Sequence, residues 1–97
     1  MKIAIASEGK EIDSEISSLG GRAPFYLIFE EGKLIESLKN PFAVGGGGAG
    51  FSVAYMLAEK DIKTVIAGKL GGNMVSALKE KGISFEEKEG TVEGALK

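Results

Sequence analysis

The sequence contains no cysteine and no histidine among its 97 residues. Without cysteine, the chain cannot form disulfides, thiolate zinc sites or cysteine-ligated iron–sulfur clusters. Without histidine, it lacks the most common general acid–base group and every Ser-His or Cys-His catalytic triad. Any function therefore has to rest on carboxylates, cationic side chains, hydroxyls and backbone groups.

An excess of positive charge and a long apolar run are also missing. The chain has 12 basic and 14 acidic residues and a net charge of −2, so nothing indicates the basic patch that nucleic-acid binding needs. No apolar run approaches the roughly 20 residues that cross a bilayer. The apolar stretch 1–6 reaches polar residues too early to be the core of a signal peptide. We therefore expect a cytoplasmic protein that binds neither nucleic acid nor a membrane.

The apolar residues that are present suffice for one packed core. Hydrophobic residues make up 43% of the chain and charged residues 27%, which is ordinary for a globular domain. A chain of this length buries roughly 60–70% of the surface that its unfolded form exposes. We predict a single domain over residues 1–97 without internal repeats.

The apolar pattern predicts five strands and three helices in the order β-β-β-α-β-α-β-α. The predicted strands are residues 2–6, 25–29, 34–38, 64–67 and a short strand around 83–85, and the predicted helices are 51–60, 74–81 and 92–96. Asn73 and Thr91 are expected to cap helix starts, and Gly82 to follow a helix end. Residues 7–22 are predicted to form a long loop, and Glu31-Gly32 a hairpin turn.

This order predicts an α/β fold in which helices flank a mixed five-stranded sheet on both faces. Strands 2–6, 25–29 and 64–67 are apolar on both faces, so we expect them at the centre of the sheet. The other two strands are interrupted by polar residues, so we expect them at the edges.

Five glycines occupy the six positions of segment 45–50. The run formally matches the G-x-G-x-x-G dinucleotide motif. However, the preceding strand is polar and ends several residues earlier, and no acid follows at the distance that ribose binding requires. Two interpretations stay open, a flexible connector and an anion site built from backbone amides at a helix start. In the second interpretation the binding residues are Gly46, Gly47 and Gly48.

A second glycine-rich turn, 68–73, follows a predicted buried strand and precedes a helix. Ligands bind at this position in open α/β sheets. Residues 7–9, which follow the first strand, should lie beside this turn, and Lys69 is placed to neutralise an anion there. The alternative is an ordinary strand–helix turn whose glycines permit close packing.

Charged residues are frequent in the predicted loop 7–22. Glu8, Asp13 and Glu15 have the oxygen ligands that Mg²⁺ prefers. Their spacing specifies no metal site, and such side chains are mostly solvated. Arg22 offers either a clamp for an oxyanion or an ion pair that pins the loop.

Several segments, spread from one end of the chain to the other, together resemble one known family. They are residues 1–6, Asp13-Ser14-Glu15-Ile16-Ser17, Gly21-Arg22-Ala23-Pro24-Phe25-Tyr26, Asn40-Pro41, Gly47-Gly48-Ala49-Gly50, Val65-Ile66-Ala67-Gly68 and Gly90-Thr91-Val92. On these segments the chain resembles the dinitrogenase iron–molybdenum cofactor biosynthesis domain family. The resemblance implies a ribonuclease-H-like sheet. It also implies a non-enzymatic carrier that binds cofactor or precursor clusters and passes them between assembly proteins.

The chain departs from the family pattern at its soft metal ligands. The family usually has a His and a Phe where this chain has Leu19 and Gly20, and often a His where it has Gly46. The ligand that the resemblance implies is an anionic iron–sulfur or iron–molybdenum cluster. Here such a cluster would lie against loop amides, Arg22 or Lys69, and not on imidazole or thiolate.

Three functions remain open from the sequence. The first is a non-catalytic binding protein for an anionic cluster or a small anion, held near Arg22, Lys69 and the glycine loop. The second is an interaction module of the same fold that has lost ligand binding and acts through an assembly-protein partner. The third, a metal-dependent hydrolase, rests on the sheet type alone, and no carboxylate lies in the predicted central strands.

Overall fold

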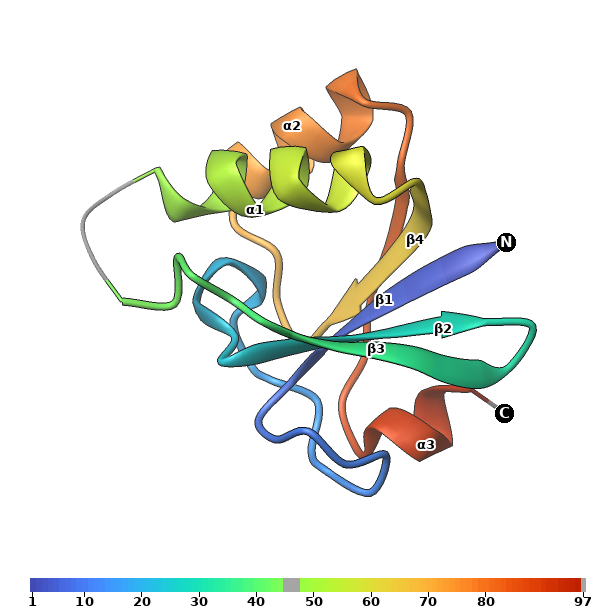
Figure 1. Cartoon of the computed structure of the whole chain (residues 1–97). Coiled ribbons are helices and arrows are strands. Elements are labelled where there is room, and N and C mark those ends of the chain that lie inside the picture. Colours follow the sequence, from blue (N-terminus) through green and yellow to red (C-terminus); the bar gives the residue numbers. More distant parts are fainter. Residues whose placement is uncertain (45–47, 97) are drawn as a thin grey trace.

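The computed structural model describes residues 1–44 and 48–96. At its centre is a sheet in the order β3-β2-β1-β4-β5 (Figure 1). The strands are β1 (Lys2–Ser7), β2 (Phe25–Glu30), β3 (Lys33–Lys39), β4 (Ile62–Ala67) and β5 (Ser84–Glu87). β1 pairs antiparallel with β2 and parallel with β4, β2 pairs antiparallel with β3, and β4 pairs parallel with β5. The predicted mixed five-stranded sheet and its two edge strands are confirmed, and the arrangement is compatible with a ribonuclease-H-like motif.

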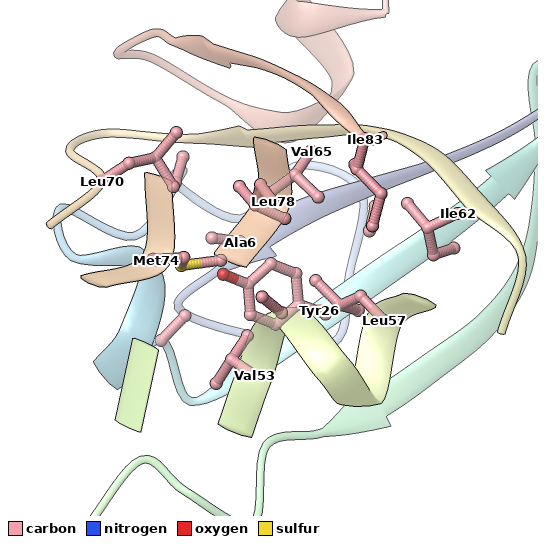
Figure 2. Close-up of a cluster of buried hydrophobic side chains, with 14 of the residues drawn as sticks. Ala6, Tyr26, Val53, Leu57, Ile62, Val65, Leu70, Met74, Leu78 and Ile83 are labelled. Carbon is pink, nitrogen blue, oxygen red and sulfur yellow. The ribbon is translucent and has the colours of Figure 1, made fainter. Parts of the chain in front are cut away.

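Helices cover both faces of this sheet, as predicted. α1 (Ala49–Glu59) and α2 (Gly72–Glu80) lie over one face, and α3 (Val92–Ala95) lies on the opposite face (Figure 1). The buried side chains accordingly form two clusters. The larger cluster lies under α1 and α2 and includes Tyr26 and Met74 (Figure 2). The smaller cluster lies on the α3 side and includes Ile5 and Val92. The inner residues of the three central strands are apolar on both faces because each face meets a core.

The hairpin between β2 and β3 has the predicted turn and one irregularity. Glu31 and Gly32 both have positive φ, 52° and 78°, which is the geometry that a two-residue type I′ turn requires. Along the hairpin, the register shifts between Ile28 and Phe29, which pair with Glu36 and Leu34. The intervening residue of β3, Ile35, is therefore a β-bulge.

Two of the predicted helix boundaries that depend on single residues are confirmed. The Thr91 hydroxyl oxygen accepts a hydrogen bond from the Gly94 amide at 3.0 Å, which caps the start of α3. Gly82, directly after the C-cap of α2, has a φ of 72°, as expected of a glycine that ends a helix.

The predicted starts of three elements are wrong by two residues. α2 begins at Gly72 with Gly71, not Asn73, in the N-cap position, because glycine is also tolerated as an N-cap and the chain turns there first. α1 begins at Ala49, not at residue 51. β4 begins at Ile62, not at residue 64, because Asp61 with a φ of 61° reverses the chain directly after α1.

The predicted long loop after β1 is confirmed between residues 8 and 19, while Ser7 belongs to β1 and residues 20–22 to a 3-10 helix. Backbone hydrogen bonds tie the loop to the sheet. The Ser17 amide donates to the Ala6 carbonyl at 2.9 Å, and the Gly68 amide donates to the Ser17 carbonyl at 2.8 Å. The loop therefore crosses the carboxyl ends of β1 and β4. It then forms a short 3-10 helix, η1 (Gly20–Arg22).

Candidate functional site

Three backbone segments surround a hollow of about 410 Å³, which we call the two-helix hollow. The segments are 19–22, which contains η1, residues 48–50 at the start of α1, and residues 71–74 at the start of α2; Lys69 completes the wall. Each segment contains glycines, so backbone atoms form much of the surface. A ligand in this hollow would therefore meet amide groups directly.

The starts of α1 and α2 can lie together only because residue 50 is a glycine. A Cβ atom at Gly50 would lie 2.9 Å from the Met74 backbone nitrogen and 3.0 Å from the Met74 Cβ. Gly21 approaches from the third segment, where a Cβ would lie 3.4 Å from the Gly50 nitrogen. The geometry of the hollow thus depends on the missing side chain at Gly50, whereas a Cβ at Gly21 would make an ordinary contact.

Neither helix start at the hollow carries a side-chain cap. The N-cap residues are Gly48 and Gly71, and no side-chain hydrogen bond caps either helix. The first amides of a helix have no acceptor within the helix, and the helix dipole adds partial positive charge at the same end. α1 has 11 residues and α2 has 9, so each has a developed dipole.

The charged side chains of the wall reinforce this potential. Arg22 and Lys69 line the hollow, and no carboxylate belongs to the part of its wall that the structure describes. Arg22 Nη1 also donates to the Phe42 carbonyl at 3.5 Å, which ties the guanidinium to the turn after β3. Converging helix starts with two cations favour an anionic ligand.

Hydrogen bonds of Gly20 tie together the two backbone segments that carry the cationic residues. The Tyr26 hydroxyl donates to the Gly20 carbonyl at 2.6 Å. The Gly20 amide in turn donates to the Lys69 carbonyl at 2.9 Å. Gly20 is therefore held from both sides, and the backbone that carries Arg22 is tied to the backbone that carries Lys69.

Tyr26 lies among the buried side chains of the larger cluster (Figure 2). Burial raises the pKa of Tyr26 far above the value of about 10 for a phenol in water, because the phenolate would lose its hydration. The folded protein therefore keeps this hydroxyl protonated, so it stays a hydrogen-bond donor to Gly20.

Tyr26→Phe is expected to lower the free energy of unfolding by about 1–2 kcal/mol at neutral pH, since the Gly20 carbonyl loses its donor. The raised pKa in the folded state also means that wild-type stability holds below about pH 10 and falls as the pH rises further. The variant should lose most of this alkaline dependence. Denaturant unfolding followed by circular dichroism from pH 7 to about pH 11 measures both effects. The exposed Tyr55 is present in both proteins, so an equal alkaline loss would contradict the assignment to Tyr26.

Three of the five predicted binding residues line the two-helix hollow. They are Arg22, Gly48 and Lys69, which come from three separate parts of the chain. Gly46 and Gly47 lie outside the described residues. Whether these residues bind a ligand remains a prediction.

The second glycine turn is packed tightly at its first residue. A Cβ at Gly68 would lie 2.7 Å from the Ser18 Cα and 2.9 Å from the Ser17 carbonyl oxygen. The close packing that was the alternative for this turn is therefore found at Gly68, while the later part of the turn opens onto the hollow. The Ser7 hydroxyl donates to the Gly9 carbonyl at 2.6 Å. It therefore stabilises the turn in which it lies.

The sequence reasoning missed Gly50 and the pairing of the two glycine turns. Each turn was considered as a separate anion site, whereas the structure joins them into one. One feature of the sequence could have indicated this pairing: both turns lead directly into helices of similar length in neighbouring βα units.

A second hollow, of about 670 Å³, lies beyond Leu19 and Lys69. Three carboxylates, of Glu15, Glu87 and Glu89, line it, which disfavours an anion. The Glu87 Oε2 atom accepts a hydrogen bond from the Leu70 amide at 2.8 Å, so this carboxylate supports the turn. Across the residues that the structure describes, no three His, Cys, Asp or Glu side chains are grouped so that they could hold a metal ion.

The family model for the dinitrogenase iron–molybdenum cofactor matches residues 1–97. The chain belongs to this family. No match to a protein of curated function was found. Within residues 1–44 and 48–96, no helix has the length and apolar character needed to cross a membrane.

Solved structures agree with the family assignment. The apo form of the orange protein from Desulfovibrio gigas is similar with a TM-score of 0.90 and 25% identity, over 98% of this chain and 82% of that one. A Thermotoga protein provisionally described as NifB has a TM-score of 0.82 and 31% identity, over 98% and 83%. A Methanocaldococcus jannaschii protein provisionally described as a dinitrogenase has a TM-score of 0.64 and 15% identity, over 99% and 84%, and shows the fold alone.

In this member of the dinitrogenase iron–molybdenum cofactor family, Leu19 and Gly20 form one rim of the hollow. Leu19, at a position where the resemblance implies a histidine, lines the hollow and is 53% exposed. The next residue, Gly20, is buried, and a Cβ there would lie 2.9 Å from Leu70 Cδ2. The rim therefore offers an apolar side chain and no imidazole.

Proposed function

We propose that the chain is a non-catalytic binding protein that holds an anionic metal cluster, as cargo, in the two-helix hollow. The observation that carries the proposal is the convergence of two uncapped helix starts with Arg22 and Lys69 around a wall without described carboxylates. The family and the likeness to the orange protein and to the NifB-like protein support a cluster as the cargo.

The residues present would hold such a cargo by charge and hydrogen bonds. Backbone amides at the starts of α1 and α2 donate to the anion, Arg22 adds a planar pair of donors, and Lys69 adds a point charge. The chain has neither imidazole nor thiolate, so no side chain of these types bonds the metal directly. Binding of this kind is exchangeable, which suits a protein that takes up and releases its ligand intact.

Titration with anions tests this proposal. The probes are a synthetic anionic iron–sulfur cluster, handled anaerobically and followed by absorbance and mass spectrometry, and molybdate and phosphate followed by calorimetry. We expect binding that weakens steeply with added salt, since screening acts most strongly on exposed charges. Arg22→Ala should weaken binding by about tenfold, the size expected for one charged hydrogen-bond partner. Lys69→Ala should weaken it less.

Lys63→Ala is the matched control, because Lys63 is an exposed lysine of β4 that does not line the hollow. Unchanged affinity in Arg22→Ala, or binding that is indifferent to salt, would refute the charge-based site. No detectable binding by the wild type would favour the second candidate, a protein-interaction module of the same fold without a ligand.

A further inference from the structure

An apolar groove of about 830 Å³ lies where β2, β3 and α1 meet. Its wall is formed mainly by the side chains of Pro24, Phe25, Leu38, Pro41, Val44 and Met56. The groove shares only Arg22 with the described wall of the two-helix hollow. Continuous apolar surface of this kind on a small protein usually marks a binding site.

Val44 is the most exposed large apolar side chain of the groove, at 91%. Val44 follows the turn at residues 40–43, which hydrogen bonds hold in place. Asn40 is buried. Its backbone amide donates to the Pro24 carbonyl at 3.0 Å, and its side-chain Oδ1 atom accepts from the Phe42 backbone amide at 2.9 Å. The turn before Val44 is therefore held by hydrogen bonds, while the Val44 side chain itself is exposed to solvent.

The second feature of the groove is its charge. Arg22 and Lys39 belong to the wall, and no carboxylate belongs to the part of the wall that the structure describes. Lys10 Nζ lies 5.7 Å from the centre of the Phe25 ring and adds a third cation. The rim is therefore positive although the chain as a whole has a net charge of −2.

The one carboxylate of β3 is directed to another partner. Both Glu36 carboxylate oxygens lie 3.1 Å from Lys60 Nζ. Glu36 is thus neutralised by a lysine at the end of α1, and does not offset the charge of Lys39 further along the strand.

We propose that the apolar groove docks an extended segment of a partner protein in which apolar side chains are flanked by acidic residues. The apolar side chains would cover Val44, Leu38 and Met56, and the flanking carboxylates would face Lys39, Lys10 and Arg22. The charge of the rim selects this chemistry, because a like-charged segment would be repelled. The proposal shares Arg22 with the proposed cluster site, but its test is independent of that site because Lys33, Lys39 and Val44 do not line the two-helix hollow.

The test uses two short synthetic peptides with the same leucine–phenylalanine core, flanked by aspartates in one and by lysines in the other. Amide chemical shifts of the full chain, recorded by NMR at low salt, report where and how tightly each peptide binds. We expect the aspartate-flanked peptide to bind about tenfold more tightly, because its charges complement the rim. Its shift changes should centre on residues 38–44 and on Met56.

Two variants and one control locate the effect. Lys39→Glu should weaken binding of the aspartate-flanked peptide by about fivefold, the size of an exposed charge pair. Val44→Ser should weaken binding of both peptides and cannot disturb the core, since its side chain is already in water. Lys33→Glu makes the same charge change at the other end of β3, away from the groove, and should leave both affinities unchanged.

Several outcomes would overturn the proposal. They are equal affinity for the two peptides, shift changes centred away from the groove, no binding at millimolar peptide, or an effect of Lys33→Glu as large as that of Lys39→Glu. A dimer of the chain in sedimentation that is lost in Val44→Ser would assign the groove to a second copy instead. None of these results depends on anion binding, so failure here and failure of the proposed cargo site are distinguishable.

Discussion

Ile5→Asp is expected to abolish cooperative folding. Ile5 is fully buried in the α3-side cluster, and its pairing partners on the neighbouring strands are Leu27 and Ile66. An aspartate there would have to be buried without a partner or protonated, and either costs several kcal/mol. The lost apolar contacts add to this cost. Since small domains are stable by only about 5–15 kcal/mol, the native state should not survive.

Circular dichroism and the dispersion of NMR amide signals measure this outcome. Ile35→Asp is the matched control, because it makes the same change at the bulge of an edge strand where the side chain is 49% exposed. This control should change the free energy of unfolding by less than about 0.5 kcal/mol. A folded Ile5→Asp protein with a sharp thermal transition would show that β1 is not the centre of the core.

Gly50→Ala should lower the free energy of unfolding by about 2–3 kcal/mol, the upper range for overpacking. The added Cβ would lie 2.9 Å from a backbone atom of Met74, which cannot move aside as a flexible side chain would. The starts of α1 and α2 must then separate. If the two-helix hollow binds anions, the affinity should fall by about tenfold in the same variant, because amides of the two helices no longer converge.

Gly72→Ala provides the control for this change. It adds the same methyl group in the first turn of the neighbouring helix, where nothing lies within 4 Å of the new Cβ. Its stability should be unchanged or higher by up to about 1 kcal/mol, because alanine restricts the unfolded chain. Equal stability of the two variants in denaturant unfolding would contradict the close approach of the helix starts.

The sheet could be predicted from the sequence because its strands differ in pattern. The inner residues of β1, β2 and β4 are apolar on both faces, whereas β3 carries Glu36 and Ser37 and half of the residues of β5 are charged. A strand covered on both faces has to be apolar on both faces, so the pattern alone separates centre from edge. The Glu31-Gly32 hairpin turn could also be predicted, because its geometry depends on two adjacent residues.

For the two-helix hollow, individual residues could be predicted from the sequence, but their arrangement around one site could not. Arg22, Gly48 and Lys69 are each recognisable as anion-binding types in suitable turns. Their meeting depends on the contact between Gly50 and Met74 and on the Gly20 hydrogen bonds to Tyr26 and Lys69. The contacts of Gly50 with Met74 and of Gly20 with Lys69 join residues far apart in sequence, and no local pattern encodes them. The start of α2 was misplaced for a related reason, since a glycine N-cap leaves no side-chain signature.

The bulge at Ile35 affects the tendency of the protein to aggregate through its edge strand β3. β3 is an edge strand, with Leu34 and Ile35 both exposed, and such edges recruit strands of other chains and start aggregation. The register shift at Ile35 interrupts the row of backbone groups that an incoming strand would have to match. Lys33 and Lys39 stand at the two ends of the strand, so a second copy would also bring like charges together. The bulge and the lysines thereby protect this edge, despite its exposed apolar side chains, against pairing with the edge strand of another molecule.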